Sequence, residues 1–298
     1  MDQASGLRQL INKQALELLD EKVFSSKSNS RSMAIAVTSG KGGVGKTNVV
    51  GNLAIAFSKL GKKVLILDGD LGLANIDILF GIRPQYNIQH VITGEKKLVD
   101  IIVNGPGNTQ IIPGGSGLQA LSNLTQGQRL LLLKEFDSIE DDVDIFLIDT
   151  GAGISTNITY FNMAAEDRIV ISTPEPTSIT DAYALIKVMY KHHGTKNFKL
   201  LVNMAKNKNE AESVFNNLDT NLMRFLKHIS LEYIGFIPRD DNILKSVRKQ
   251  KPLLLSYPRS IAGKSFSLLA QNMLNGKTNK SEGTIQFFWK KFMSNIQS

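Results

Sequence analysis

Two lysines stand five positions apart in the glycine-rich stretch GKGGVGKT, residues 40–47. The stretch matches the pattern G-x-x-x-x-G-K-[ST], in which backbone N–H groups surround the phosphate oxygens of a nucleotide. In this pattern Lys46 contacts the β- and γ-phosphates, and the Thr47 hydroxyl binds Mg²⁺. One lysine is sufficient for these contacts, so Lys41 requires a different role. The residues predicted to surround the phosphates are Gly40, Lys41, Gly42, Gly43, Val44, Gly45, Lys46, Thr47 and Asn48.

Acidic residues follow two apolar segments that can end beside this loop. Asp149 follows IFLI, and we expect it to hold a water bound to the magnesium ion. Asp68 and Asp70 alternate at the end of LILDGD, so both can face a terminal phosphate, where a carboxylate can orient an attacking water. Without the glycine-rich loop, the same residues would indicate only turns or helix caps.

Strands must bring the loop and the carboxylates to one place. Seven short apolar segments alternate with helical patterns, and they begin at Met33, Lys63, Thr109, Asp144, Arg168, Lys199 and Glu232. This alternation predicts an α/β fold with a doubly wound, mostly parallel sheet flanked by helices, the arrangement of P-loop NTPases. We expect one such domain over residues 33–275. The carboxyl ends of its strands meet at one edge, where nucleotides bind.

Composition limits the chemistry further. The 298 residues are 42% hydrophobic and 21% charged, which is sufficient for a full core. We expect a cytoplasmic protein, because there is no run of eighteen apolar residues and no apolar leader after the initial MDQASG. The absence of cysteine excludes cysteine-ligated zinc, iron–sulfur clusters and thiol nucleophiles. The net charge of +8 is compatible with solvated lysines or with an anionic partner.

A separate segment is predicted at each end of the domain. Residues 1–24 carry a helical pattern, and the Ser-rich residues 25–32 form a linker. Residues 276–283 form a second linker before the segment 284–298. In that last segment, apolar residues recur at helical spacing and form a stripe of Ile285, Phe288, Trp289, Phe292, Met293 and Ile296.

The stripe predicts an amphipathic helix that binds an anionic membrane surface. Lys290 and Lys291 lie off the stripe, where lipid headgroups would be, and Trp289 is the only tryptophan of the chain. Two lysines give roughly 1 kcal/mol each near such a surface, so one helix should bind reversibly and a dimer with two helices more tightly. A last helix docked on the core would show the same stripe, and docking is therefore the alternative.

The loop KGGVGKT resembles the K-G-G-x-x-G-K-[ST] loop of the deviant Walker A, or MinD/ParA, ATPases. The resemblance includes DGDLGLANID, DTGAG, TPEPTSITDAYALIK and GFIPRDD, and it spans nearly the whole chain. It implies Mg²⁺-dependent ATP hydrolysis by a homodimer, in which Lys41 reaches the ATP of the partner subunit and Lys46 serves its own. The resemblance implies that Asp70 orients the attacking water. It also implies metal binding by Thr47, Asp70 and, through a water, Asp149. An adenine pocket is implied for Asn203, Pro238 and Arg239.

Within this family the details resemble the flagellar-number regulators, the FlhG/FleN (YlxH) subgroup. Asn48 stands where division proteins usually carry a second Thr, and DTGAG replaces their Ser-Pro-Ala-Gly type. The subgroup implies control of flagellar number or placement at the inner face of the cell membrane, with a flagellar C-ring protein or transcription regulator as partner.

The start of the chain resembles the D-Q-A-x-x-L-R element with which these regulators stimulate the SRP-type GTPase FlhF. The resemblance assigns that contact to Asp2, Gln3, Ala4, Leu7 and Arg8. By itself, Asp2 before a helical pattern would indicate a helix N-cap.

Other classes of protein remain to be weighed. A ParA-type segregation ATPase would bind DNA through a basic cluster such as Lys245, Arg248, Lys249 and Lys251. We regard DNA as the less favoured partner, and salt-dependent DNA retention without vesicle binding would select it. Nitrogenase-type iron proteins need bridging cysteines, which this chain lacks. Metabolic ligases of this fold need an acceptor pocket, for which the sequence shows no motif.

Overall fold

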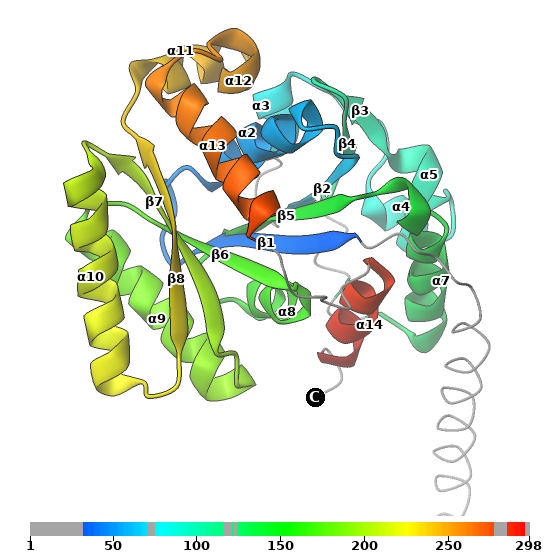
Figure 1. Ribbon diagram of the computed structural model, residues 1–298. Helices are drawn as coiled ribbons and strands as arrows, with labels where there is room; N and C mark the ends of the chain where they lie inside the picture. The colour runs from blue at the N-terminus through cyan, green and yellow to red at the C-terminus, as the bar shows by residue number, and fades with distance from the viewer. Residues whose placement is uncertain (1–31, 71–74, 116–120, 122–123, 277–284, 296–298) are drawn as a thin grey trace, which may run out of the picture. The chain divides into compact units, whose positions relative to one another are not determined.

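An eight-stranded sheet organises the described part of the chain (Figure 1). The computed structural model describes residues 32–70, 75–115, 121, 124–276 and 285–295. The strands are β1 (Met33–Ser39), β2 (Val64–Gly69), β3 (Val103–Gly105), β4 (Thr109–Ile112), β5 (Ile145–Ala152), β6 (Asp167–Ser172), β7 (Asn197–Ala205) and β8 (Ser230–Pro238). Their order is β3-β4-β2-β5-β1-β6-β7-β8, and only the short pair β3 and β4 is antiparallel.

The predicted α/β class and mostly parallel sheet are confirmed. Each of the seven predicted apolar segments forms a strand, because both faces of a doubly wound sheet are buried and its strands are continuously apolar. β3 was not predicted, since three residues are too few to give a recognisable apolar pattern.

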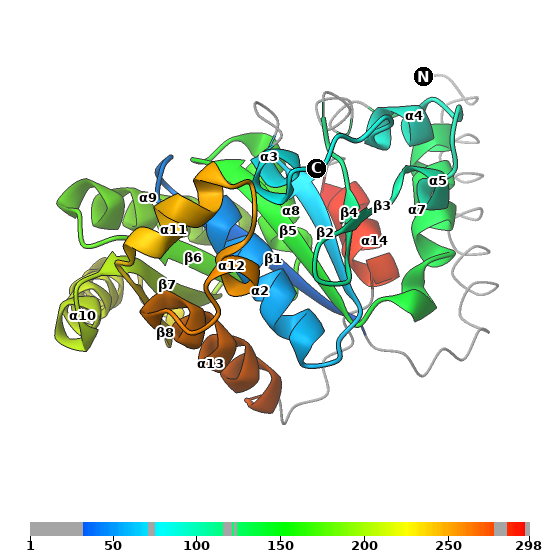
Figure 2. The ribbon, with the colours of Figure 1, turned by 90° about the horizontal axis from the view of Figure 1, so that it is seen from above.

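Helices cover both faces of the sheet. On one face lie α2 (Lys46–Lys59), α3 (Asn75–Phe80), α11 (Asp241–Arg248), α12 (Leu253–Ser256) and α13 (Ile261–Asn275), which Figure 2 shows from above. On the other lie α4 (Ile88–Ile92), α5 (Leu98–Ile101), α7 (Gln126–Asp137), α8 (Thr156–Ala164), α9 (Pro176–His193), α10 (Lys208–Phe225) and α14 (Ile285–Asn295). A short 3₁₀ turn, Glu140–Asp142, precedes β5.

Successive side chains of a strand point to opposite faces of the sheet, so each strand contributes to the hydrophobic cores on both faces. Ile35 and Val37 of β1 pack with α2 and α13, whereas Ala34 and Ala36 face α8 and α14. Because the strands other than β3 pair in parallel, their carboxyl ends meet at one edge of the sheet. The loop that follows β1 lies at this edge, and so do the ends of β2 and β5.

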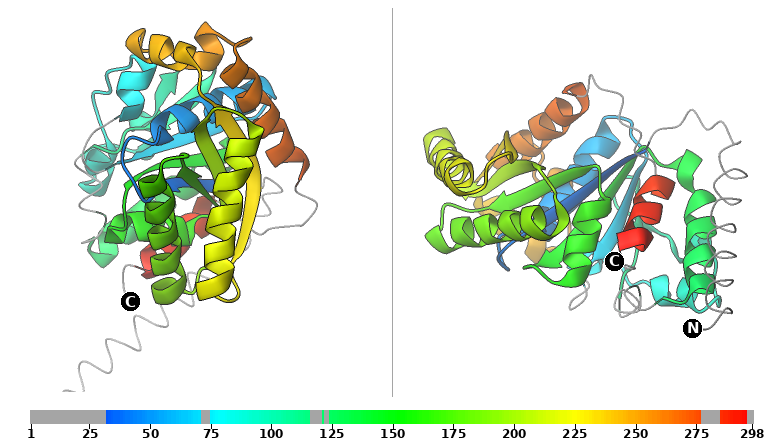
Figure 3. Two further views of the ribbon diagram at one scale, coloured as in Figure 1. Left: turned by 90° about the vertical axis from the view of Figure 1, so that its left-hand side faces the viewer. Right: turned by 90° about the horizontal axis from the view of Figure 1, so that it is seen from below.

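α14 packs against α7 and α8, beside the sheet (Figure 3). The Trp289 ring stacks on Phe136 of α7 with centroids 4.1 Å apart, and Phe292 stacks on Phe161 of α8 at 4.8 Å. At the start of the helix, the Ile285 N–H donates a hydrogen bond of 2.9 Å to the Ser32 hydroxyl.

The expectation of a detached C-terminal segment is therefore corrected. Ile285, Phe288, Trp289, Phe292 and Met293 are at most 5% exposed, and Ile296 lies outside the described residues. Docking removes a large aromatic area from water, and this burial favours the bound helix over a free one. Among the described residues, no helix combines the length and the hydropathy that crossing a membrane requires.

Candidate nucleotide-binding site

The glycine-rich loop connects β1 to α2 at the carboxyl edge of the sheet. Gly43 and Gly45 have φ values of 79° and 87°, which side chains with a Cβ rarely adopt, and Gly45 caps α2. Gly40 packs so closely on α9 that a Cβ would clash with the Asp181 carbonyl oxygen. The glycine-rich loop is therefore a tightly packed turn that leads directly into α2. The N–H groups of the first turn of α2 are available to bind an anion such as a phosphate.

Lys46 is 8% exposed at the base of this loop. Burial lowers the pKa of its ammonium group, and the charges of Asp149 and Asp70 oppose this effect. A buried ammonium group beside two carboxylates is compensated electrostatically, but it is not surrounded by water. Phosphate oxygens at the loop would supply the anions that such a group favours.

Asp68 and Asp149 occupy neighbouring register positions on β2 and β5. Burial, with the neighbouring Asp149 charge, raises the pKa of Asp68 to about 8, and burial raises the pKa of Asp149 to about 7. The Thr47 hydroxyl and the Lys46 charge partly offset the shift at Asp149. No donor among the described residues completes a hydrogen bond to either Asp149 oxygen. Thr47 is therefore close enough to influence the Asp149 carboxylate without satisfying it.

The two acidic residues after β2 have different surroundings. Asp68 accepts hydrogen bonds from the Ile76 N–H (3.3 Å) and the Asp70 N–H (3.4 Å), so it supports the start of α3. Asp70 Oδ2 accepts a bond of 3.3 Å from the Asn75 amide, and its other oxygen lies beside Gly151 near the end of β5. The charge of Asp70 acts on both Lys46 and Asp149, so Asp70 lies close to the place where a phosphate would bind.

Several buried polar atoms at this edge lack a partner among the described residues. They are the side-chain oxygens of Thr38, Asn48, Asp149 and Thr173. Buried polar groups are normally satisfied, so their clustering at the ends of β1, β5 and β6 and in the first turn of α2 indicates a site for a polar ligand. Hydroxyl and carboxylate oxygens next to a phosphate-binding loop fit a magnesium nucleotide. Thr47 and Asp149 are the residues that would hold the metal.

The Lys41 side chain contacts the start of α9 and not the loop to which it belongs. Its ammonium group donates to Glu175 Oε2 at 2.6 Å and to the Thr177 hydroxyl at 2.8 Å, both at the start of α9. The Lys41 side chain is 36% exposed and that of Glu175 64%, whereas Lys46 is buried. The two lysines of the loop therefore occupy different environments. Glu175 and Thr177 were not predicted as site residues, because contact across 134 positions leaves no sequence pattern.

The residues assigned to adenine lie at the ends of β7 and β8. The Asn203 amide donates to the Val44 carbonyl oxygen at 2.7 Å, and its oxygen accepts from the Met204 N–H at 3.0 Å. Asn203 is 4% exposed, Pro238 is buried and Arg239 is exposed. The structure thus brings Asn203 to the phosphate-binding loop as an anchor, a role that the sequence did not predict.

Two other sets of predicted residues lie elsewhere. Asp2, Gln3, Ala4, Leu7 and Arg8 lie outside the described residues. The basic residues of the DNA-binding alternative, Lys245, Arg248, Lys249 and Lys251, are exposed at and after the end of α11. In that group, the Lys249 ammonium donates to the Tyr257 hydroxyl at 3.0 Å.

Comparison with known proteins gives consistent matches. A family model described as an AAA domain matches residues 32–202. The antiactivator FleN of Pseudomonas aeruginosa is 44% identical over 239 residues, which cover 80% of this chain and 85% of FleN. The flagellum site-determining protein YlxH of Helicobacter pylori is 32% identical over 98% of both chains.

Solved structures agree with this assignment. The septum site-determining protein MinD of Pyrococcus horikoshii, complexed with Mg-ADP, is 25% identical with a TM-score of 0.66 and covers 84% of this chain and 100% of its own. MinD in the MinC:MinD cell division complex of Aquifex aeolicus gives 26% identity, a TM-score of 0.64 and coverage of 85% and 100%. With the loop and its two lysines, these similarities show that the chain is a MinD/ParA-type ATPase and belongs to the branch that contains FleN and YlxH (FlhG).

Proposed function

We propose that the chain is a switch that pairs with a second copy when both hold MgATP, and that the paired form regulates flagellar number or placement. The placement of the two lysines is the observation that carries this proposal. Lys46 is buried in its own loop, whereas Lys41 is partly exposed and turned toward α9. A lysine at the rim can reach a nucleotide held by another copy.

Each residue of the site has a defined part in the proposed hydrolysis. The loop N–H groups and Lys46 hold the phosphates, and Thr47 and Asp149 hold the magnesium ion, Asp149 through a water. The ion, when bound, supplies charge neutralisation at the phosphates. Asp70 orients the attacking water, and Lys41 of the second copy neutralises charge in the transition state. Hydrolysis is therefore slow until two copies meet. Asn203, Pro238 and Arg239 border the place where the base would lie.

A lysine substitution tests the pairing. We expect Lys41→Ala to bind ATP but to lose both ATP-dependent dimerisation, measured by light scattering, and hydrolysis. Lys264→Ala on the exposed face of α13 removes the same charge at a distance from the loop and should behave as wild type. A Lys41→Ala protein that pairs and hydrolyses ATP normally would refute the proposed division of roles. Asp70→Ala should slow hydrolysis and preserve the ATP-bound dimer.

Membrane attachment is the second part of the proposal, and it requires α14 to leave its docked position. Two features weaken docking. The Trp289 indole N–H is buried without a hydrogen-bond partner among the described residues, and an unsatisfied donor costs about 1–3 kcal/mol. Lys291 is half-buried on the docked helix, and burial together with the charge of Arg168 lowers its pKa. α8, on which α14 packs, directly follows the loop after β5, so changes at the nucleotide can reach α14.

Vesicle binding tests this part. Sedimentation with phosphatidylglycerol vesicles should require MgATP and should be lost in Trp289→Glu, which places a charge on the apolar stripe. Phe287→Glu adds the same charge on the opposite side of the helix and should retain binding. Wild-type ATPase rates and helical circular dichroism would establish that both variants are folded, whereas the melting temperature of Trp289→Glu should be lower because its charge enters a buried position of the docked helix. Wild-type binding by Trp289→Glu would exclude α14 as the membrane-binding element.

The flagellar part of the proposal rests on the relatives and on the first residues of the chain. A peptide of residues 1–24 should accelerate GTP hydrolysis by the SRP-type GTPase FlhF, and the Arg8→Ala peptide should not. No acceleration by the wild-type peptide would remove FlhF from the proposal. A C-ring protein or a flagellar transcription regulator would then remain as the proposed partner.

DNA binding is the alternative function, because Lys245, Arg248 and Lys251 are exposed together at the end of α11. If this patch contacts phosphates, duplex DNA retention should require ATP and fall steeply with salt. Replacing the three residues by Glu should then abolish retention and preserve vesicle binding. DNA retention without vesicle binding would favour the ParA-type function over the flagellar one.

A further inference from the structure

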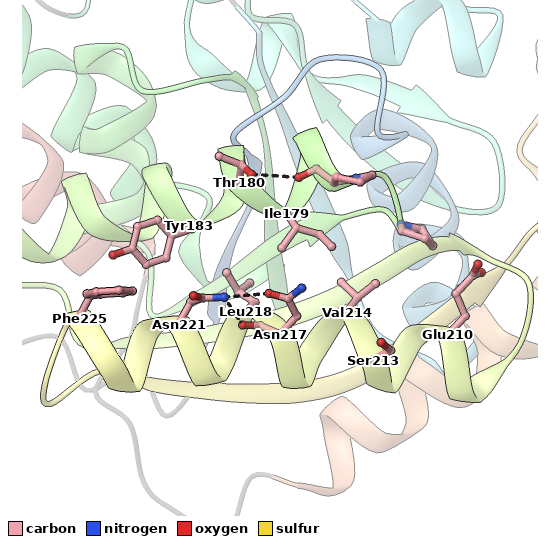
Figure 4. Close-up of a pocket in the computed structure, with 12 residues that line it drawn as sticks. Ile179, Thr180, Tyr183, Glu210, Ser213, Val214, Asn217, Leu218, Asn221 and Phe225 are labelled. Atoms are coloured by element: carbon pink, nitrogen blue, oxygen red, sulfur yellow. Dashed lines mark hydrogen bonds between the residues drawn. The ribbon is translucent and has the colours of Figure 1, made fainter.

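A groove of about 640 Å³ runs between α9 and α10, and Figure 4 shows the residues that line it. Ile179, Val214 and Leu218 line it with apolar side chains, and Val214 and Leu218 are at most 4% exposed. Asn217 and Asn221 lie on α10, where the Asn221 amide donates to the Asn217 side-chain oxygen at 2.8 Å. None of these residues belongs to the nucleotide-binding site described above.

The shape of the groove matches a helix. Its lining residues lie on one stripe of each helix, from Pro176 to Tyr183 on α9 and from Glu210 to Phe225 on α10. At 1.5 Å per residue, the α10 stripe is about 22 Å long, which is the length of a helix of about four turns. A helix that packs between two others presents apolar residues at i, i+3, i+4 and i+7 to such a groove.

Basic side chains surround one end of the groove. The Lys187 ammonium lies 6.0 Å from the centroid of the Tyr183 ring, and the Arg224 guanidinium lies 5.2 Å from that of Phe225. Tyr183 and Phe225 lie together at this end in Figure 4, whereas Glu210 lies at the other. An occupant should therefore carry carboxylates at the Phe225 end.

The connecting loops extend this positive surface. Lys191, Lys196 and Lys227 are exposed at the end of α9 and in the two loops. The Tyr190 hydroxyl donates to the Lys227 carbonyl oxygen, and the Ser230 N–H donates to that of Lys196, both at 2.8 Å. These contacts hold the two loops together, so Lys196 and Lys227 are exposed on a fixed backbone near this end of α9 and α10.

The groove fits a protein helix better than a nucleic acid or a membrane. Its apolar floor is recessed between two helices, so a flat lipid surface would not reach Leu218. Glu210, which lies inside the groove, would repel a phosphate backbone. Phe225 at one end of the groove is 60% exposed, and an exposed apolar side chain rimmed by charges is typical of protein interfaces.

We propose that this groove docks an acidic amphipathic helix of another protein. The apolar stripe of that helix lies on Val214 and Leu218, its polar side chains hydrogen-bond to Asn217 and Asn221, and its carboxylates face Lys187 and Arg224. The proposal is independent of the proposed pairing and membrane attachment, because it uses none of the residues that carry them.

A stapled fluorescent peptide of about 16 residues can test the proposal on the full chain. It carries one leucine stripe and glutamates at one end, and a second peptide carries lysines in place of the glutamates. Fluorescence anisotropy should show at least tenfold tighter binding of the acidic peptide. Ser213→Arg, which fills the groove from an exposed position on α10, should weaken that binding at least tenfold. Asn216→Arg adds the same charge on α10 outside the groove and should not weaken it.

Charge reversal gives the second half of the test. The double variant Lys187→Glu, Arg224→Glu should bind the basic peptide in preference to the acidic one. Absence of binding, equal affinity for both peptides, or full binding by Ser213→Arg would overturn the proposal. The proposal would also be overturned if neither peptide binds the wild-type chain and the double variant loses only its retention of duplex DNA or of phosphatidylglycerol vesicles. The basic residues would then serve a nucleic acid or a membrane.

Discussion

The Lys41 ammonium lies 2.6 Å from Glu175 Oε2, although Lys41 belongs to the phosphate-binding loop and Glu175 precedes α9. The Thr177 hydroxyl accepts a second hydrogen bond from the same ammonium. Both contacts hold the Lys41 ammonium group at α9, whereas the proposed pairing requires this group at the nucleotide of a second copy. Lys41 must therefore leave Glu175 before it can reach a nucleotide in a second copy, and the two positions of the lysine compete.

Substitution of Glu175 should shift this competition. Glu175→Gln removes the charge that holds Lys41, and an exposed ion pair contributes about 0.2–1 kcal/mol. We expect the ATP concentration for half-maximal dimerisation to fall by up to about fivefold, since 1.4 kcal/mol corresponds to a factor of ten. Sedimentation velocity at graded ATP concentrations measures this midpoint.

A matched control is available on α10. Glu212 forms an exposed ion pair with Lys208 at 3.5 Å, so Glu212→Gln removes a similar charge at a distance from the loop. Its midpoint should equal that of the wild type. A Glu175→Gln midpoint that is unchanged or higher would mean that the ion pair does not restrain Lys41.

The buried pair Asp68 and Asp149 should make the metal-free protein less stable as the pH rises. In the unfolded chain both groups ionise near pH 4, whereas in the folded chain the pKa of Asp68 is raised to about 8 and that of Asp149 to about 7. Between these limits the folded state holds protons that the unfolded state has released. The free energy of unfolding therefore falls as the pH rises through this window, and the fall ends above the folded pKa values.

Urea unfolding in EDTA between about pH 5 and 8 tests this dependence, because each such group adds a slope of up to about 1.4 kcal/mol per pH unit. Asp149→Asn keeps the shape of the side chain but cannot titrate. Its free energy of unfolding should therefore fall less steeply with pH, by up to about 1.4 kcal/mol per pH unit, the contribution of one proton. Asp142→Asn, at an exposed position paired with Lys63, should keep the wild-type slope. A wild-type slope in Asp149→Asn would assign the titration to other groups.

Sequence patterns were sufficient for the sheet and the phosphate-binding loop, because both depend on local rules. Buried parallel strands require continuous apolar runs, and the turn around Gly43 and Gly45 requires positive φ values. The position of α14 was not predictable in this way. The stripe through Trp289 fits a lipid surface and the α7–α8 groove equally well, and only the groove's shape distinguishes them. The contact of Lys41 with Glu175 likewise depends on how α9 packs against the loop.

The unique tryptophan makes the position of α14 measurable. Trp289 is fully buried and stacked on Phe136, so its fluorescence emission should be that of an apolar environment. If MgATP releases the helix, emission should shift to the red without vesicles and back to the blue when phosphatidylglycerol vesicles are added. In a Lys46→Ala variant, which cannot hold the phosphates, MgATP should cause no shift. An emission spectrum that MgATP leaves unchanged in the wild type would indicate that α14 stays docked.

Asn203 offers a choice between two roles that a single ligand series can separate. Its amide holds the Val44 carbonyl of the phosphate-binding loop at 2.7 Å, and resemblance to the family assigns it to the adenine base. In Asn203→Ala the Val44 carbonyl loses this donor, and the loss of a buried hydrogen bond costs about 1–3 kcal/mol.

If Asn203 anchors the loop, binding of ATP, ADP and tripolyphosphate should all weaken by about tenfold or more, because each depends on the loop. If Asn203 contacts only the base, tripolyphosphate binding should be unchanged, since that ligand has no base, and discrimination between ATP and GTP should be lost instead. Isothermal titration calorimetry measures all four ligands, and Asn209→Ala, at an exposed position on α10, serves as the control. Unchanged tripolyphosphate affinity in Asn203→Ala would exclude the anchoring role, because the hydrogen bond to Val44 would then contribute nothing to the shape of the loop.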